Sequence, residues 1–147
     1  GLDEGYLTKI SDGRTFGEAL LDLAPLYVSA IKQCQDNNIS IKYASHITGH
    51  GWRKIMRASE PFIYEIDEIM PVQPVFDFIQ EHAGFDDREM YETFNMGAGY
   101  MLIVSPDQAG DIPGGTIVGT VKKQGDEKRV EIKPLGVTFG GEELQVR

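Results

Sequence analysis

The stretch HITGHG, residues 46–51, has the residue types of a ligand-binding turn. Thr48 offers a hydroxyl, and the glycines that follow it would let an anion approach the main chain. A helix that begins here would add unpaired N–H groups and a partial positive charge. Three cationic side chains follow the turn: Arg53, Lys54 and Arg57. The sequence suggests a phosphate site. The alternative is a tight strand-to-helix turn in which the glycines serve only the backbone geometry.

A second glycine-containing break, TFNMGAG at residues 93–99, lies between a predicted helix and a predicted strand. Asn95 offers a side-chain amide, and Gly97 and Gly99 would let a ligand or a partner backbone come close. The alternative is a simple helix stop, with Asn95 or Gly97 in the left-handed conformation.

The other polar residues predict neither a metal centre nor a familiar catalytic motif. His46 and His50 flank the first turn, whereas His82 ends an amphipathic helix, where a surface role is expected. Two histidines across a glycine lack a third ligand, so we assign no metal. The acidic runs at 65–68 and 142–143 are typical of solvated faces. The sequence has no Walker A run and no G-x-S-x-G motif.

Length and charge predict one soluble domain. The chain has 147 residues, 41% of them hydrophobic, and a net charge of −9, which disfavours binding to nucleic acids and anionic membranes. Cys34 is the only cysteine, so a disulfide within the chain is excluded and a reducing, cytoplasmic setting is expected. Neither a membrane span nor a signal peptide is predicted.

Hydrophobic periodicity predicts an α+β fold with a mixed sheet and helices packed on it, because helices and strands alternate first and strands dominate later. In the segment after the first turn, Trp52, Ile55 and Met56 share one helical face and the cations share the other. A capping box is expected at Asp86 and Glu89. The predicted helices cover residues 25 to about 35, 52–58, 74–83 and 86–94. The predicted strands cover 39–47, 61–69, 100–105, 116–123 and 129–139, the last two joined by the turn QGDE.

The HITGHG turn, together with GRTFGEALL and PVQPVFDFIQEHAGFDDREMYETFNMGAGYMLIV, resembles the C-terminal half of phosphoribosylformylglycinamidine cyclo-ligase, the aminoimidazole ribonucleotide synthetase of purine biosynthesis. The resemblance runs from about Gly13 to Val104, and its most specific element is EMYETFNMG, residues 89–97. It implies that residues 1–147 are the C-terminal, substrate-side domain of a two-domain enzyme that forms a homodimer. The N-terminal half would bind most of the ATP and Mg²⁺. ATP would phosphorylate the formyl-amide oxygen of formylglycinamidine ribonucleotide, and the amidine nitrogen would then close the imidazole ring as phosphate leaves.

The resemblance also implies that His46, Thr48, Gly49, Gly51, Asn95, Met96 and Gly97 bind the substrate or its phosphate. His50 and Arg53 join these candidates because of their place in the turn and in the cationic segment after it. His50 stands where the family usually has a glycine, and the basic GWRKIMR replaces a more apolar continuation. A helix that the family has after LIVSPDQAGDI is absent. The alternatives are a non-catalytic paralogue that binds a phosphorylated metabolite or dimerises, and a relative with another substrate. Formylglycinamidine ribonucleotide synthetase, selenophosphate synthetase and thiamine-monophosphate kinase share the architecture.

Overall fold

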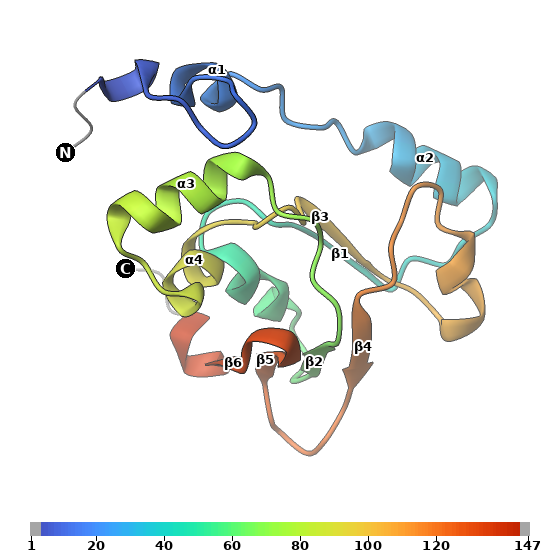
Figure 1. Cartoon of the computed structure of the whole chain (residues 1–147). Coiled ribbons are helices and arrows are strands. Elements are labelled where there is room, and N and C mark those ends of the chain that lie inside the picture. Colours follow the sequence, from blue (N-terminus) through green and yellow to red (C-terminus); the bar gives the residue numbers. More distant parts are fainter. Residues whose placement is uncertain (1–3, 145–147) are drawn as a thin grey trace.

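The centre of the computed structural model, which describes residues 4–144, is a mixed four-stranded sheet (Figure 1). The strands β2 and β5 run parallel, and the two outer pairs are antiparallel. In spatial order the strands are β4 (Gly119–Lys122), β2 (Ile63–Ile66), β5 (Arg129–Ile132) and β6 (Val137–Gly140). The predicted α+β class with a mixed sheet is confirmed.

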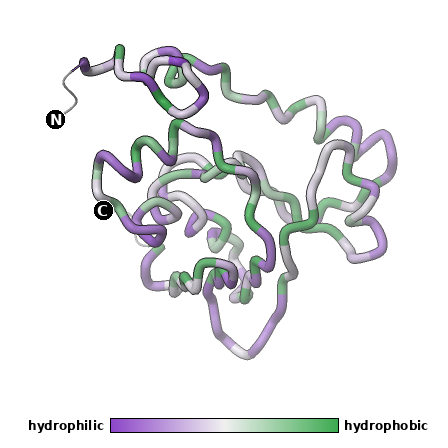
Figure 2. The backbone as a smooth tube through the Cα atoms, in the orientation of Figure 1, coloured by the Kyte–Doolittle hydropathy of each residue, from purple (hydrophilic) through white to green (hydrophobic). Residues whose placement is uncertain are grey.

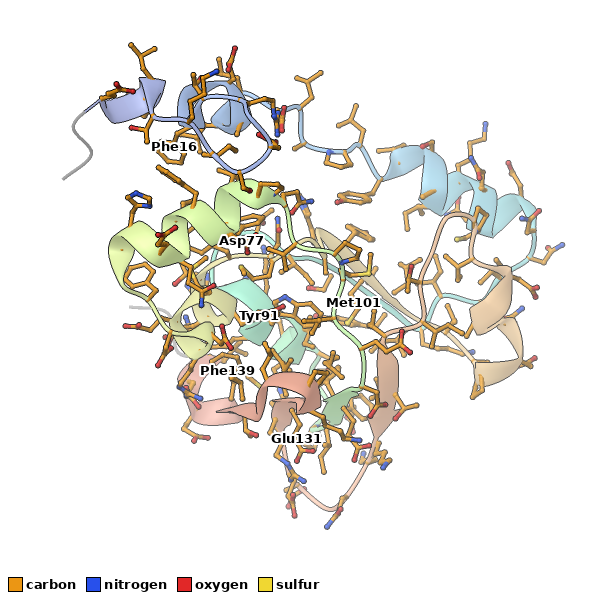
Figure 3. The ribbon with its side chains drawn as sticks, viewed as in Figure 1. Phe16, Asp77, Tyr91, Met101, Glu131 and Phe139 are labelled. Atoms are coloured by element: carbon orange, nitrogen blue, oxygen red, sulfur yellow. The ribbon has the colours of Figure 1, made fainter. Side chains whose placement is uncertain are left out.

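One face of this sheet forms the main core. Along β5, the buried Val130 and Ile132 alternate with the charged Arg129 and Glu131. Tyr64 lies opposite Val130 in the parallel register, and both are buried. Tyr91 and Phe139 belong to the same core, whereas Glu131 lies outside it (Figure 3). The other face is charged, and the hydrogen bonds from Lys122 and Lys133 hold the pKa of the Glu65 carboxyl below its usual range.

Two strands form a separate antiparallel ribbon, β1 (Tyr43–His46) with β3 (Tyr100–Ile103). Both predicted strands are confirmed but are shorter than expected. His46 lies opposite Tyr100, so the end of β1 and the start of β3 meet at one end of the ribbon. This end carries both glycine-containing turns.

Helices cover the apolar side of the sheet and the ribbon. The predicted bounds of the helix over 74–83 are confirmed, and the predicted capping box at Asp86 and Glu89 is present. The first predicted helix begins later than expected, at Val28. Tyr27, the residue before this helix, makes no side-chain cap hydrogen bond and instead stacks on Tyr100 of β3. The α-helices are α1 (Phe16–Leu20), α2 (Val28–Asp36), α3 (Pro74–Ala83) and α4 (Asp87–Thr93). The 3-10 helices are η1 (Gly5–Leu7), η2 (Gly51–Arg57), η3 (Pro106–Asp111), η4 (Lys133–Leu135) and η5 (Gly141–Leu144).

The last two predicted strands are joined by a turn, as expected, but they do not pair with each other. β4 and β5 are consecutive along the chain, but β2 lies between them in the sheet. The predicted strand over 129–139 is in fact two strands. Pro134, which has no N–H for a ladder, and Gly136, whose φ is +64°, turn the chain so that β6 folds back on β5.

No helix within residues 4–144 has the length and apolar character needed to cross a membrane.

The buried hydroxyl of Tyr64 gives a prediction for alkaline pH. This hydroxyl has no hydrogen-bond partner among the described residues, and burial raises the pKa of Tyr64 to about 12. The folded protein therefore keeps Tyr64 protonated, while the unfolded chain ionises it near pH 10. The free energy of unfolding should fall as the pH rises from about 10 through about 12.

Replacing Tyr64 by phenylalanine should make this alkaline loss smaller, and at neutral pH it should be neutral or stabilising by about 1 kcal/mol, because it removes an unpaired hydroxyl. Urea unfolding at several pH values measures both effects. Tyr6→Phe is the control, since Tyr6 is exposed. A steeper alkaline loss in Tyr64→Phe would contradict the prediction.

Candidate functional site

The two glycine-containing turns lie side by side at one end of the β1–β3 ribbon. The amide of Ile47 donates a hydrogen bond of 2.9 Å to the carbonyl of Gly99. The indole N–H of Trp52 donates one of 2.9 Å to the carbonyl of Asn95. The fold therefore brings together two stretches that are separated by more than forty residues in the sequence.

The first turn has an unusual backbone, because Gly49, His50 and Gly51 are all left-handed, with φ of +53°, +61° and +48°. Glycine adopts this conformation freely, whereas a side chain there costs about 1 kcal/mol. His50 is therefore the one residue of the three that the backbone geometry disfavours. The turn leads into η2, which is a 3-10 helix rather than an α-helix.

The two glycines of this turn have different surroundings. A Cβ atom on Gly51 would lie 2.1 Å from the carbonyl oxygen of Tyr91, so this glycine allows the turn to pack on α4. A Cβ on Gly49 would meet no atom within 4 Å. Gly51 therefore fits the structural alternative, while the space beside Gly49 is open to a ligand.

Polar groups of the first turn are available for an anion. Among the described residues, no acceptor pairs with the amide of Gly49 or that of His50. The ammonium of Lys54 lies 2.9 Å from the carbonyl oxygen and 2.8 Å from the hydroxyl of Thr48. Two free N–H groups beside a fixed cation form an arrangement suited to a phosphate or a carboxylate.

Arg53, the first of the three cations that follow the turn, already has partners within the fold. The guanidinium of Arg53 pairs with the carboxylate of Glu92 at 2.9 Å. It also donates to the main-chain oxygens of Glu143 and Glu92, at 3.0 and 3.2 Å. Its side chain is only 16% exposed. Arg53 therefore ties η2 to α4 and η5, because the chain folds distant acceptors against it.

The second turn, residues 93–99, is held in place by its own hydrogen bonds and close contacts. The side-chain oxygen of Asn95 accepts a hydrogen bond from the amide of Gly97, at 3.1 Å. Met96 is buried, and both Met96 and Gly97 are left-handed, with φ of +48° and +92°. A Cβ on Gly97 would lie 2.4 Å from the carbonyl oxygen of Pro71. These contacts give Asn95, Met96 and Gly97 structural roles, in which the chain is turned from α4 into β3.

His46 belongs to an aromatic group that the sequence did not reveal. The rings of Tyr27 and Tyr100 stack with centroids 4.9 Å apart, and His46 lies 5.8 and 5.9 Å from them. The hydroxyl of Tyr27 covers Gly99, where a Cβ would lie 2.1 Å from it. These rings line one wall of a shallow groove of about 660 Å³ between α2 and the ribbon. Only the pairing of β1 with β3 brings them together.

The molecule is thus an α+β domain with an open glycine turn beside an aromatic groove. No protein-family model matches the chain. Among curated proteins, the phosphoribosylformylglycinamidine cyclo-ligase of Methanococcus maripaludis is 38% identical over 102 residues, which are 69% of this chain and 29% of that relative. The enzyme of the same name from Methanocaldococcus jannaschii is 36% identical over 105 residues, 71% of this chain and 30% of the relative.

The matched region extends further in Methanopyrus kandleri, whose phosphoribosylformylglycinamidine cyclo-ligase is 34% identical over 122 residues, 83% of this chain and 34% of the relative. The chain belongs to the phosphoribosylformylglycinamidine cyclo-ligase family. It spans about a third of the length of these relatives.

Proposed function

We propose that this chain is the C-terminal, substrate-side domain of an ATP-dependent cyclo-ligase that converts formylglycinamidine ribonucleotide to aminoimidazole ribonucleotide in purine biosynthesis. The family supports the reaction class, because the relatives carry that name. The observation that supports this role is the open turn at 48–51, where the amides of Gly49 and His50 have no acceptor among residues 4–144 and the ammonium of Lys54 bonds to Thr48.

In this proposal the turn holds the phosphate of the ribonucleotide. The two amides donate to phosphate oxygens, Lys54 balances part of their charge, and Thr48 keeps Lys54 in place. His46 stands at the wall of the adjoining groove, where the remainder of the ribonucleotide would lie. Ring closure then depends mainly on how the substrate is positioned. ATP and Mg²⁺ are bound mainly by the N-terminal half of the protein, which acts in the cytoplasm as a homodimer.

The proposal predicts that ADP formation needs more than this chain. The chain alone should release no ADP from ATP and Mg²⁺, with or without formylglycinamidine ribonucleotide. Co-expression with the part of the Methanocaldococcus jannaschii relative that the match leaves uncovered should give ADP only when the ribonucleotide is present. ADP release by the chain alone, above a control without enzyme, would contradict the proposal. A combined protein that gives no substrate-dependent ADP would favour a non-catalytic module.

His50 favours a second candidate, a relative with an altered substrate. Its side chain occupies the middle of the turn in a backbone conformation that suits glycine. A side chain retained at such a cost is expected to serve a contact that glycine lacks. His50→Gly in the combined protein separates the two candidates. Unchanged or faster turnover of formylglycinamidine ribonucleotide supports the first candidate, and a loss of ligand binding with an intact fold supports the second.

A further inference from the structure

The segment of residues 20–28, which we call the leucine strip, exposes an unusual amount of apolar surface. Leu21, Leu23, Leu26 and Val28 are 82, 94, 86 and 78% exposed. Figure 2 shows the strip as the stretch between α1 and α2, with hydrophobic residues along it. Single exposed leucines are common in folded proteins, but a run of four in one short segment marks an interaction surface.

Main-chain N–H groups of the leucine strip are also open to a partner. In the part of the chain that the structure describes, the amides of Leu23, Ala24, Leu26 and Tyr27 donate no hydrogen bond to another protein group, and Pro25 has no N–H. Residues 22–26 of the strip have no regular secondary structure and connect α1 to α2 as an irregular segment (Figure 1). Exposed N–H groups beside exposed leucines are what an added strand or loop of a partner would pair with.

The leucine strip continues into the aromatic groove. Pro25, Leu26, Tyr27 and Val28 line that groove, together with His46 and Tyr100. A partner seated on the strip would therefore reach the ribbon end that carries the turn at 48–51. Binding of such a partner would cover the strip and complete the site at the turn in a single step.

We propose that the leucine strip and its groove are the docking surface for the ATP-binding part of the same cyclo-ligase. This inference rests on the proposed function. The relatives have about two thirds of their length outside the match, so a partner large enough to cover the strip exists within the family. Its contacting face should be apolar, with main-chain carbonyls available to the amides of Leu23, Ala24, Leu26 and Tyr27. A second copy of this chain is the competing occupant.

The test measures association with the co-expressed, uncovered part of the Methanocaldococcus jannaschii relative. The full 147-residue chain should co-purify with it as a one-to-one complex in light-scattering chromatography. Leu23→Asp and Leu26→Asp should each weaken the complex at least about tenfold, because a charge replaces a buried apolar anchor. Leu7→Asp is the matched control, since Leu7 is 71% exposed but lies in η1 outside the strip. Circular dichroism checks that every variant stays folded.

The outcomes separate docking from catalysis. A complex that both strip variants retain, an equal loss in Leu7→Asp, or no complex with the unaltered chain would overturn the docking surface. A dimer of the chain alone that Leu23→Asp dissociates would assign the strip to a second copy and also overturn it. If the complex forms and the strip variants weaken it, but no ADP forms in response to substrate, the docking surface would stand and the proposed function would be overturned. If ADP formation depends on substrate and is unchanged in both strip variants, the proposed function would stand and the docking surface would be overturned.

Discussion

Gly51→Ala should lower the free energy of unfolding by about 3 kcal/mol or more, the largest stability effect expected of any single methyl group in the turn. The new Cβ would lie 2.1 Å from the carbonyl oxygen of Tyr91 and 2.7 Å from the carbonyl carbon of Glu92. These are main-chain atoms of α4, so no side chain can move aside. The left-handed backbone, with φ of +48°, adds a further cost.

The matched control is Gly49→Ala, which places the same methyl group in the same turn. Gly49 is also left-handed, but a Cβ there meets nothing within 4 Å, so only the conformational cost of about 1 kcal/mol is expected. Urea unfolding of the two variants measures the difference. Equal losses at the two positions would show that the turn does not pack on α4 as described.

Removing the guanidinium of Arg53 is expected to cost about 2 kcal/mol. Arg53→Met keeps much of the apolar length but leaves Glu92 and the carbonyl of Glu143 without their donor. Because η5 is held through Glu143, hydrogen exchange should become faster there than in the sheet. Arg57→Met is the control, since Arg57 is exposed and a surface substitution changes stability by only about 0.5 kcal/mol.

The same pair of variants decides what Arg53 does. A stability loss in Arg53→Met with unchanged phosphate binding would confirm a structural role. Weaker binding at unchanged stability would show instead that Arg53 is one of the ligand-binding residues. Arg57→Met should change neither quantity.

Local signals in the sequence predicted the elements that local chemistry determines. Pro74 at a first helical position and Gly84 in the left-handed cap fix the bounds of α3. The side chains of Asp86 and Glu89 start α4 through reciprocal bonds to the backbone. Trp52, Ile55 and Met56 are buried as their helical spacing predicted.

Such local signals could not predict how strands that are distant in the sequence pair with one another. Nothing near β4 or β5 indicates that β2 lies between them, because that choice depends on which apolar faces meet in the folded chain. The acceptor for Arg53 at Glu143 is 90 residues away, and the obstacle beside Gly51 comes from α4. The sequence alone could not divide the glycines into one that packs and one that is open.

An NMR titration of the isotope-labelled chain with formylglycinamidine ribonucleotide would show whether the turn at 48–51 holds the phosphate of a ribonucleotide. We expect the amide resonances of Gly49 and His50 to shift most, since those N–H groups have no acceptor in the described structure. The dephosphorylated ribonucleoside should leave them unmoved. Amide shifts that the ribonucleoside reproduces, or resonances of Gly49 and His50 that stay fixed at saturating ribonucleotide, would contradict a phosphate site at this turn.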